Sequence, residues 1–219
     1  MITEIRLNKV TPNIFVGSPP EGGPTELWDK DVSFRKGTSY LVEASSGRGK
    51  SSFCSFIYGL RSDYSGTIEW IGDDGNTLVM TEAAKCHIRK HSIAMMFQEH
   101  RIFPELTAVE NVMLKNLLTN FYTEREIRAM LSLLGLRERL DTPCARLSFG
   151  QQQRVAFVRT LSQPADFILL DEPISHLDAE NAAIMGEILK KREDSDNVGI
   201  IVTSIGNRLD YPYKKIIKL

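Results

Sequence analysis

The 219-residue sequence predicts an α/β fold in which helices cover a parallel sheet. Two observations are the continuous apolar runs Phe167–Leu170 and Val198–Val202, which have the composition of strands buried on both faces. The third is a β-prone run at 39–44, which passes through a turn of small residues into a helical pattern. Strand, tight loop and helix in this order are typical of the α/β class.

Three helices are predicted from apolar residues that recur with helical spacing. One follows residue 50, one lies in TEREIRAMLSLL at 123–134, and one connects the two buried strands. Their apolar positions, in that order, are Phe53, Phe56, Ile57 and Leu60; Ile127, Met130, Leu131 and Leu134; and Met185, Ile188 and Leu189. Near the N-terminus, GSPPEGGP at 17–24 predicts an exposed connection between two early strands. A mostly helical insertion is expected between about Gln98 and Leu147.

Composition excludes several classes of protein. The 27 Lys and Arg residues balance 28 Asp and Glu residues, so the chain lacks the basic charge of a nucleic-acid-binding protein. Its apolar runs are far shorter than the roughly 20 residues of a membrane span, and MITEIRLNK lacks the apolar core of a signal peptide. We therefore expect a cytoplasmic protein. Cys54, Cys86 and Cys144 have no disulfide-like or zinc-like spacing and are expected to be buried or half-buried thiols.

The segment ASSGRGKSS at 44–52 predicts a phosphate-binding loop. Such a loop needs small residues whose N–H groups curl around an anion, a Lys for the outer phosphates, and a hydroxyl for Mg²⁺. The helix that begins near Lys50 adds the partial positive charge of its N-terminus. Ala44 replaces the first glycine of the usual pattern, which is tolerable where the backbone keeps a negative φ. The expected phosphate-contacting residues are Ser46, Gly47, Arg48, Gly49, Lys50, Ser51 and Ser52.

An acidic pair follows the first buried strand. Asp171 stands at the end of this strand, at the sheet edge where a magnesium-bound water is held in α/β nucleotide-binding proteins. The adjacent Glu172 is a candidate general base for the attacking water. On its own such a pair is usually a solvated strand end, but the phosphate loop makes the functional interpretation stronger.

A further motif, LSFGQQQR at 147–154, resembles the signature segment of ATP-binding cassette (ABC) ATPases, with Phe149 in place of the first glycine of LSGGQ. Gln98 in MMFQEHRIFPELTAVENV resembles the Q-loop glutamine of that family, and SHLD at 175–178 resembles its D-loop. The five motifs occur in the family's order and span nearly the whole chain. The resemblance implies one ABC ATPase domain over residues 1–219, with a RecA-like P-loop NTPase core, an N-terminal antiparallel β portion and the inserted helical subdomain.

The resemblance also implies roles for individual residues. Two ATPase subunits, identical or different, would pair head to tail around ATP and drive a transmembrane permease subunit from the inner face of the cell membrane. Lys50 would contact the β and γ phosphates, and Glu172 would activate the hydrolytic water. The implied magnesium-binding residues are Ser51, Gln98 and Asp171. The implied contacts to the partner's ATP are Ser148, Gly150 and Gln151. Gln98 would also link the nucleotide to the helical insertion.

Some positions depart from the family pattern. After the strand GIIVT the family has a switch histidine, whereas this chain has Ser204, which can donate a hydrogen bond but cannot carry an imidazolium charge. We therefore expect slow turnover. Phe15 is the candidate for stacking on adenine, and Trp28 is expected to be a core anchor. Arg48 either approaches a phosphate or is a solvated loop charge.

Two other functions compete with a transport ATPase. One is an ATP-dependent binding switch that regulates a membrane partner with little hydrolysis, for which Ala44 and Ser204 are the motivation. The other is a non-transport ABC protein acting on ribosomes or DNA, which the neutral net charge disfavours. Because the chain ends soon after the last predicted core strand, we expect no C-terminal regulatory domain. In this respect it resembles the compact lipoprotein-release, macrolide-export and cell-division ATPase subunits.

Overall fold

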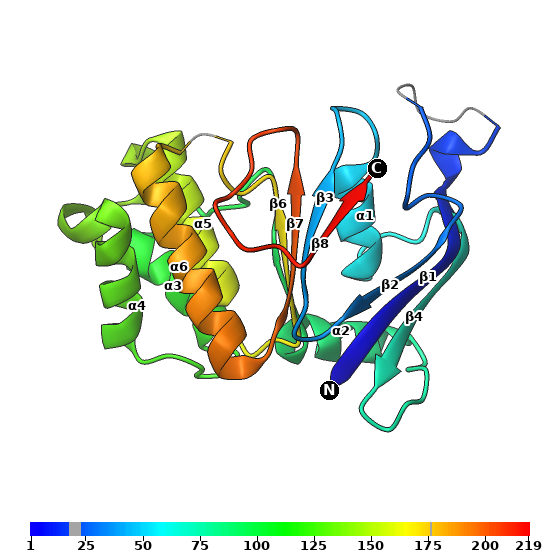
Figure 1. The fold of residues 1–219 in the computed structure, drawn as a ribbon. Coiled ribbons are helices and arrows are strands. Elements are labelled where there is room, and N and C mark those ends of the chain that lie inside the picture. Colours follow the sequence, from blue (N-terminus) through cyan, green and yellow to red (C-terminus); the bar gives the residue numbers. More distant parts are fainter. Residues whose placement is uncertain (18–22, 176) are drawn as a thin grey trace.

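The computed structural model describes residues 1–17, 23–175 and 177–219, and over these ranges the chain forms two sheets that pack around helices (Figure 1). The smaller sheet is antiparallel, in the order β2-β1-β4, with β1 at Ile2–Pro12, β2 at Asp31–Arg35 and β4 at Tyr64–Gly72. The larger sheet is parallel, in the order β5-β6-β7-β3-β8. Its strands are β3 at Ser39–Glu43, β5 at Ile93–Met96, β6 at Phe167–Asp171, β7 at Gly199–Ser204 and β8 at Lys215–Lys218.

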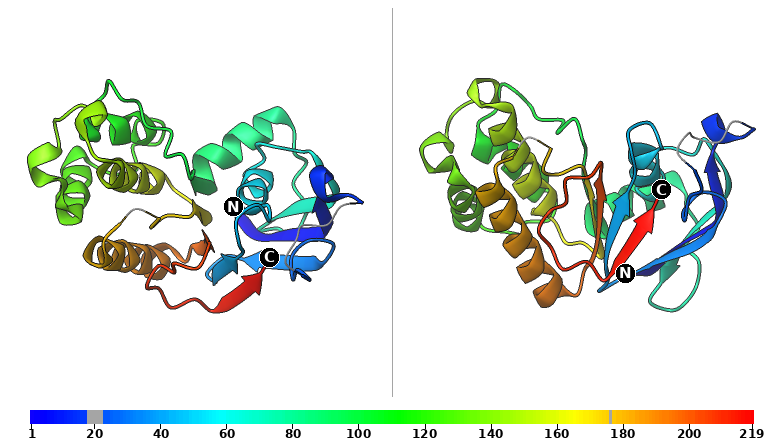
Figure 2. Two further views of the ribbon diagram at one scale, coloured as in Figure 1. Left: turned by 90° about the horizontal axis from the view of Figure 1, so that it is seen from above. Right: turned by 45° about the horizontal axis from the view of Figure 1, so that its top comes forward.

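The helices lie on both faces of the parallel sheet. On the side of the antiparallel sheet are α1 at Lys50–Ile57 and α2 at Glu82–His91. The opposite side carries α3 at Ala108–Asn116, α4 at Glu124–Leu131, α5 at Phe149–Leu161 and α6 at Ala179–Asp196 (Figure 2). Short turns of helix complete the chain at Asn13–Phe15, Ser132–Leu136, Arg137–Arg139 and Cys144–Arg146.

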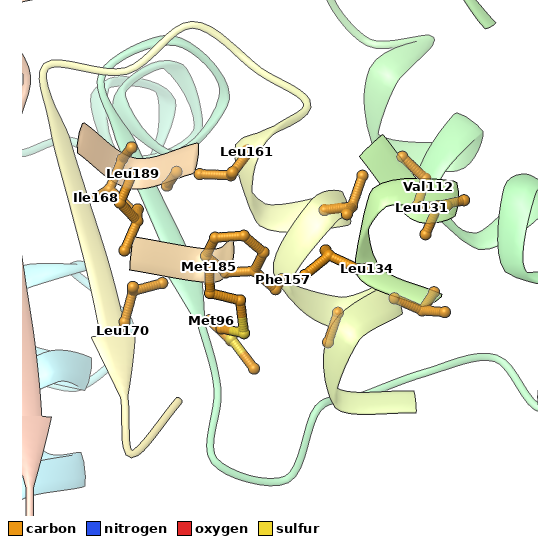
Figure 3. Close-up of a cluster of buried hydrophobic side chains, with 14 of the residues drawn as sticks. Met96, Val112, Leu131, Leu134, Phe157, Leu161, Ile168, Leu170, Met185 and Leu189 are labelled. Atoms are coloured by element: carbon orange, nitrogen blue, oxygen red, sulfur yellow. The ribbon is translucent and has the colours of Figure 1, made fainter. Parts of the chain in front are cut away.

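Alternate side chains of the central strands fill two cores, because successive residues of a strand point to opposite faces. Ile168 and Leu170 of β6 pack with α3, α5 and α6 in a buried cluster that includes Phe157 and Met185 (Figure 3). Phe167 and Leu169 of the same strand pack with α1 and the antiparallel sheet. Every residue of β6 and β7 is buried, which confirms the prediction of strands covered on both faces.

The helical region has clear local signals. Thr107 and Thr123 each begin a helix with a reciprocal capping box, the first with Glu110 and the second with Glu126. The predicted amphipathic pattern at 123–134 forms α4 only as far as Leu131. The chain then leaves helical geometry near Gly135, where φ is +72°, although Leu134 stays fully buried.

The structure corrects two smaller predictions. Leu60 lies beyond the end of α1 and is 43% exposed, so it does not share the buried face of that helix. Cys86 is exposed, whereas Cys54 and Cys144 are buried as expected. The segment GSPPEGGP does connect β1 to β2, although residues 18–22 lie outside the described part of the chain.

The carboxyl ends of three neighbouring strands are in register at one edge of the parallel sheet. Asp171 of β6 pairs with Thr203 of β7, and Ser204 of β7 pairs with Glu43 of β3. Ligands of open α/β sheets bind outside this edge. The fold therefore brings the acidic pair and the segment after β3 to the same place.

Candidate functional site

The segment 44–52 forms a turn between β3 and α1 in which Gly47 and Gly49 have φ values of +80° and +93°. Only glycine adopts such values without strain. Ala44 is absent from the described residues with positive φ, so its methyl group is compatible with the turn. Its N–H donates to the carbonyl of Ser204 at 3.1 Å, which ties the start of the loop to β7.

Lys50 is folded back over the loop and is 5% exposed. Its Nζ donates to the carbonyl oxygens of Ala44 and Ser45 at 3.1 and 2.9 Å, and lies 3.4 Å from Glu172 Oε1. The ammonium therefore sits between the phosphate loop and the acidic pair. At the first turn of α1 it joins the partial positive charge of the helix N-terminus, a suitable position for binding an anion.

Two aromatic rings support the loop from the side of the antiparallel sheet. A Cβ on Gly49 would lie 3.0 Å from Phe15 Cε2 and 3.1 Å from Trp28 Cζ2, so this position needs glycine for space as well as for φ. Trp28 is 3% exposed, packs edge-on against Phe53, and donates its indole N–H to the Arg48 carbonyl at 3.0 Å. Trp28 is thus a core anchor, as predicted.

Phe15 lines a cavity of about 300 Å³ above the phosphate loop. The cavity wall also includes Lys50, Ser51, Gln98 and Glu172. The structure therefore brings Phe15 to the mouth of the phosphate loop, where a flat ring is available for stacking.

Two predicted phosphate contacts have other partners. Arg48 is buried, and its Nη2 donates to the Gly23 carbonyl at 2.7 Å. It is therefore not a solvated loop charge, and this bond directs its guanidinium to Gly23 and not to the phosphate-loop cavity. Ser52 Oγ accepts a hydrogen bond from Arg61 Nη1 at 3.1 Å, although Ser52 still lines the cavity. Ser46 and Gly47 line the same cavity and are exposed.

Gln98 bridges the loop and the acidic pair. Its Oε1 accepts from Ser51 Oγ at 3.4 Å, and its Nε2 donates to Glu172 Oε2 at 3.2 Å. These three side chains come from α1, from the turn after β5, and from the end of β6. The predicted Q-loop glutamine therefore contacts both Ser51, a candidate magnesium ligand, and Glu172, a candidate base.

Glu172 has an unusual backbone conformation, with φ at +51°, and is 8% exposed. Its N–H donates to Thr203 Oγ1 at 3.2 Å, and its carbonyl accepts from Gln153 Nε2 at 3.4 Å. Burial raises the pKa of the Glu172 carboxyl, the charge of Asp171 raises it further, and Lys50 opposes this shift. A buried carboxylate with a raised pKa has the properties of a general base.

Thr203 is a site residue that the sequence analysis missed. It is fully buried in β7, and its Oγ1 donates to Asp171 Oδ1 at 2.6 Å while accepting from the Glu172 N–H. A single hydroxyl thus orients both acidic residues. Gln153 is a second missed residue: it lies in the signature segment at 147–154, and its side chain donates to the Glu172 carbonyl. The polar residues Thr203 and Ser204 at the end of an apolar run were the available signal for Thr203.

Ser204 lies at the rim of the site, where it lines a second cavity with Gln98 and Glu172. Its Oγ donates to the Asn207 carbonyl at 2.5 Å and accepts from the Gly206 N–H at 3.1 Å. Among the described residues, the Ser204 hydroxyl is thus engaged within its own turn and does not donate to Glu172, because the side chain is short and the turn closes on it.

The signature segment lies on the other face of the parallel sheet from α1. Ser148 caps α5 in a reciprocal box: its Oγ accepts from Gln151 N at 3.3 Å, and its own N–H donates to Gln151 Oε1 at 2.9 Å. The capping box therefore already satisfies one of the N–H groups in the first turn of α5. Among the described residues, neither Ser148, Gly150 nor Gln151 lines the phosphate-loop cavity.

The donor set suits Mg²⁺ bound together with phosphate groups. No group of three His, Cys, Asp or Glu side chains able to hold a metal occurs among residues 1–17, 23–175 and 177–219. Mg²⁺ does not need one, because it prefers oxygen ligands and usually keeps waters and substrate phosphates. Ser51 Oγ and Gln98 Oε1 are adjacent oxygens, and Asp171, which precedes Glu172 at the end of β6, is 2% exposed. The hydroxyl and amide fit direct contact, and the buried carboxylate fits contact through water.

The pKa of Glu172 gives a direct test of this arrangement. In the nucleotide-free chain we expect it to lie above the ordinary value of about 4.3 for a Glu side chain. Asp171→Asn removes a nearby negative charge and should lower it, whereas Lys50→Met removes the opposing positive charge and should raise it. The measurement is a carboxyl carbon NMR titration, with the signal assigned by Glu172→Gln. If the pKa of Glu172 has the ordinary value and changes with neither substitution, the described geometry is contradicted.

Comparison with known proteins gives a consistent result. A family model described as ABC transporter matches residues 27–175. The lipoprotein-releasing system ATP-binding protein LolD of Novosphingobium aromaticivorans is 33% identical over 207 residues, which cover 91% of this chain and 90% of that protein. LolD of Legionella pneumophila (strain Lens) is 31% identical over 182 residues, covering 82% and 79%.

Solved structures agree with these relatives. The dimeric structure of MJ0796, a bacterial ABC transporter cassette, superposes with a TM-score of 0.78 at 25% identity and covers 98% of this chain and 94% of that one. A dimeric post-hydrolysis state of the same cassette bound to ADP and Pi gives a TM-score of 0.75 at 25% identity, covering 93% and 88%. The family model spans more than half of the chain, and the chain therefore belongs to the ABC transporter family, as an ATP-binding ATPase cassette.

Proposed function

We propose that this chain is the ATP-hydrolysing subunit of a transporter of the lipoprotein-releasing type and that it acts on a separate transmembrane permease. The observation that carries the proposal is the contact of Lys50, Gln98 and Glu172 across one cavity. The likeness to LolD proteins over most of both chains supports the transporter type. No described helix is long and apolar enough to cross a membrane, so in this proposal the permease provides the attachment to the inner face of the cell membrane.

In the proposed mechanism the residues at the sheet edge each have one task. Lys50 leaves the loop carbonyls and Glu172 to contact the β and γ phosphates, while Ser46, Gly47 and Gly49 present backbone N–H groups. Bound Mg²⁺ would neutralise phosphate charge, held by Ser51 and Gln98, with Asp171 acting through a water. Glu172 accepts the proton of the attacking water, and Thr203 keeps its backbone in position.

The arrangement of two subunits is part of the proposal. Phe15 stacks on adenine beside Gly49, and Ser148, Gly150 and Gln151 approach the nucleotide of a second cassette. The position of the α5 N-terminus away from its own phosphate loop supports this head-to-tail pairing, as do the dimeric MJ0796 structures. Residues 1–219 would then act as one cassette whose helical insertion, at about 98–147, faces the permease. No nucleic-acid partner is proposed.

Steady-state ATP hydrolysis by the purified chain with Mg²⁺ tests the function. We expect measurable turnover that Lys50→Ala abolishes and that Ser204→His increases, because an imidazole reaches beyond the turn that occupies the serine hydroxyl. Adding liposomes with a co-expressed permease should stimulate the native chain. Tight ATP binding without turnover, in both the native chain and Ser204→His, would favour the ATP-dependent binding switch instead.

A further inference from the structure

Phe149 lies in the first turn of α5 and is 49% exposed. The signature sequence LSGGQ of ABC ATPases has a glycine at this position. Its ring lies against the imidazole of His100, with centroids 4.5 Å apart and planes tilted by 41°. This separation is within the range of favourable aromatic pairs. The contact joins two segments that are 49 residues apart in sequence and belong to different motifs, the signature segment and the turn after Gln98.

The turn that carries His100 is strained and tightly held. His100 is 3% exposed with φ at +55°, and the next residue, Arg101, has φ at +46°. The His100 N–H donates to the Phe97 carbonyl at 3.0 Å, which closes the turn around Gln98. Non-glycine residues keep left-handed geometry only where the surroundings impose it. A displacement of Gln98 is therefore passed to His100 within one rigid turn.

The same turn is held by the other end of α5. Arg159, in the last turn of that helix, donates through Nη2 to the His100 carbonyl at 2.5 Å. His100 thus contacts α5 twice, through its ring near the helix N-terminus and through its carbonyl near the C-terminus. Because these contacts involve both ends of α5, they restrain the direction of the helix axis as well as the distance between the helix and the turn. The direction of α5 determines where its N-cap residue, Ser148, lies.

We propose that the stack of Phe149 on His100 positions α5 relative to Gln98, so that nucleotide bound at one phosphate loop sets the placement of Ser148 toward the second subunit. This inference rests on the proposed head-to-tail pairing. When Gln98 exchanges its contact with Glu172 for one with bound nucleotide, the strained turn shifts and α5 moves with it through the ring contact. Phe149 is a positioning residue, since it acts on Ser148 through the helix and not on the nucleotide. Coupling between two sites requires an element with two arrangements, and in this proposal that element is the turn together with α5.

The test measures dimer formation against ATP concentration by sedimentation velocity, in chains that all carry Glu172→Gln to prevent hydrolysis. Phe149→Ala removes one ring, and His100→Asn removes the other while keeping a residue that tolerates positive φ. Each is expected to raise the ATP concentration for half-maximal dimerisation by about two- to tenfold, the range for loss of an aromatic pair. The double variant should show no greater change than either single variant, because both remove the same contact. Phe149→Tyr should keep the parent value.

Two further measurements separate positioning from simple loss of structure. ATP affinity of the dilute monomer should stay within about twofold of the parent, since the phosphate-loop cavity does not include Phe149. Phe103→Ala is the matched control, because it removes a comparably exposed ring, at 51%, from the chain just after the turn. It should leave dimerisation unchanged.

Several outcomes would overturn the inference. If Phe149→Ala weakens dimerisation and His100→Asn does not, the ring acts directly on the second subunit. If both variants weaken ATP binding by the monomer as much as they weaken dimerisation, the contact only maintains the fold. If the parent dimerises with ATP and neither variant changes it, this inference alone fails. If the parent never dimerises with ATP, the proposed function fails as well.

Discussion

Glu172→Gln is expected to slow ATP hydrolysis by about 10²- to 10⁴-fold, the usual contribution of a general base. The amide keeps the shape of the carboxylate and an oxygen for Lys50, but it cannot accept the proton of the attacking water. ATP binding is expected to persist, so the variant should accumulate as an ATP-bound dimer. The measurements are phosphate release in a single turnover and sedimentation of the chain with ATP.

Glu43→Gln is the matched control for this loss. Glu43 is another carboxylate at the end of a strand of the same sheet edge, but it pairs with Arg208 at 2.5 Å and lies outside the described lining of the phosphate-loop cavity. Its substitution should leave turnover within about twofold, as for most surface pairs. Hydrolysis by Glu172→Gln at more than a tenth of the native rate would show that another group, or water alone, removes the proton.

Gly49→Ala is expected to remove detectable ATP binding and to lower the stability of the nucleotide-free chain. The added Cβ meets Phe15 and Trp28 at about 3 Å, and the backbone there has φ at +93°. The left-handed conformation costs roughly 1–2 kcal/mol for a non-glycine residue, and displacing two packed rings adds typically 1–3 kcal/mol of overpacking. Urea unfolding and ATP titration measure the two effects.

Gly47→Ala separates the two contributions to the Gly49 effect. Gly47 has φ at +80°, but apart from its two chain neighbours no atom of the described residues lies within 4 Å of an added Cβ, so it should show the backbone cost without the crowding. Its free energy of unfolding should therefore fall less than that of Gly49→Ala. Equal losses in the two variants would mean that the rings of Phe15 and Trp28 move aside freely and do not define the loop.

The sequence predicted the parts of the site that short segments specify by themselves. The loop glycines, Lys50 and Asp171 were predicted because each lies in a short motif directly after an apolar run, so that no partner remote in sequence is needed to recognise it. Residues whose partners are remote in sequence were harder to predict. Thr203 reaches Asp171 only because β7 pairs in register with β6. The hydrogen bond from Ser204 to the Asn207 carbonyl depends on the path of the chain after β7. The contact of Phe149 with His100 was not predicted either, because these residues are also remote from each other in sequence.

Exposure was also predicted less well than secondary structure. Leu60 fits the apolar spacing of α1, but the helix ends before it, so its side chain faces solvent. Cys86 lies on a helix whose only buried residue is Ile88. Apolar spacing indicates which side chains share a face, but the end of the helix and the area of the opposing surface decide how many of them are covered.

The position of β3 between β7 and β8 has a consequence for synthesis of the chain. Its two neighbours in the described sheet, β7 and β8, are the last strands in the sequence, so residues 39–43 gain no partner strand until residues beyond 199 have left the ribosome. The N–H of Ala44 likewise cannot make its hydrogen bond to the Ser204 carbonyl until Ser204 has been synthesised. Pairing over such long separations is slow, and until it occurs the apolar faces of β3 remain open to chaperones or to aggregation. The phosphate loop, although specified by nine consecutive residues, is therefore among the last parts of the molecule to take its final shape.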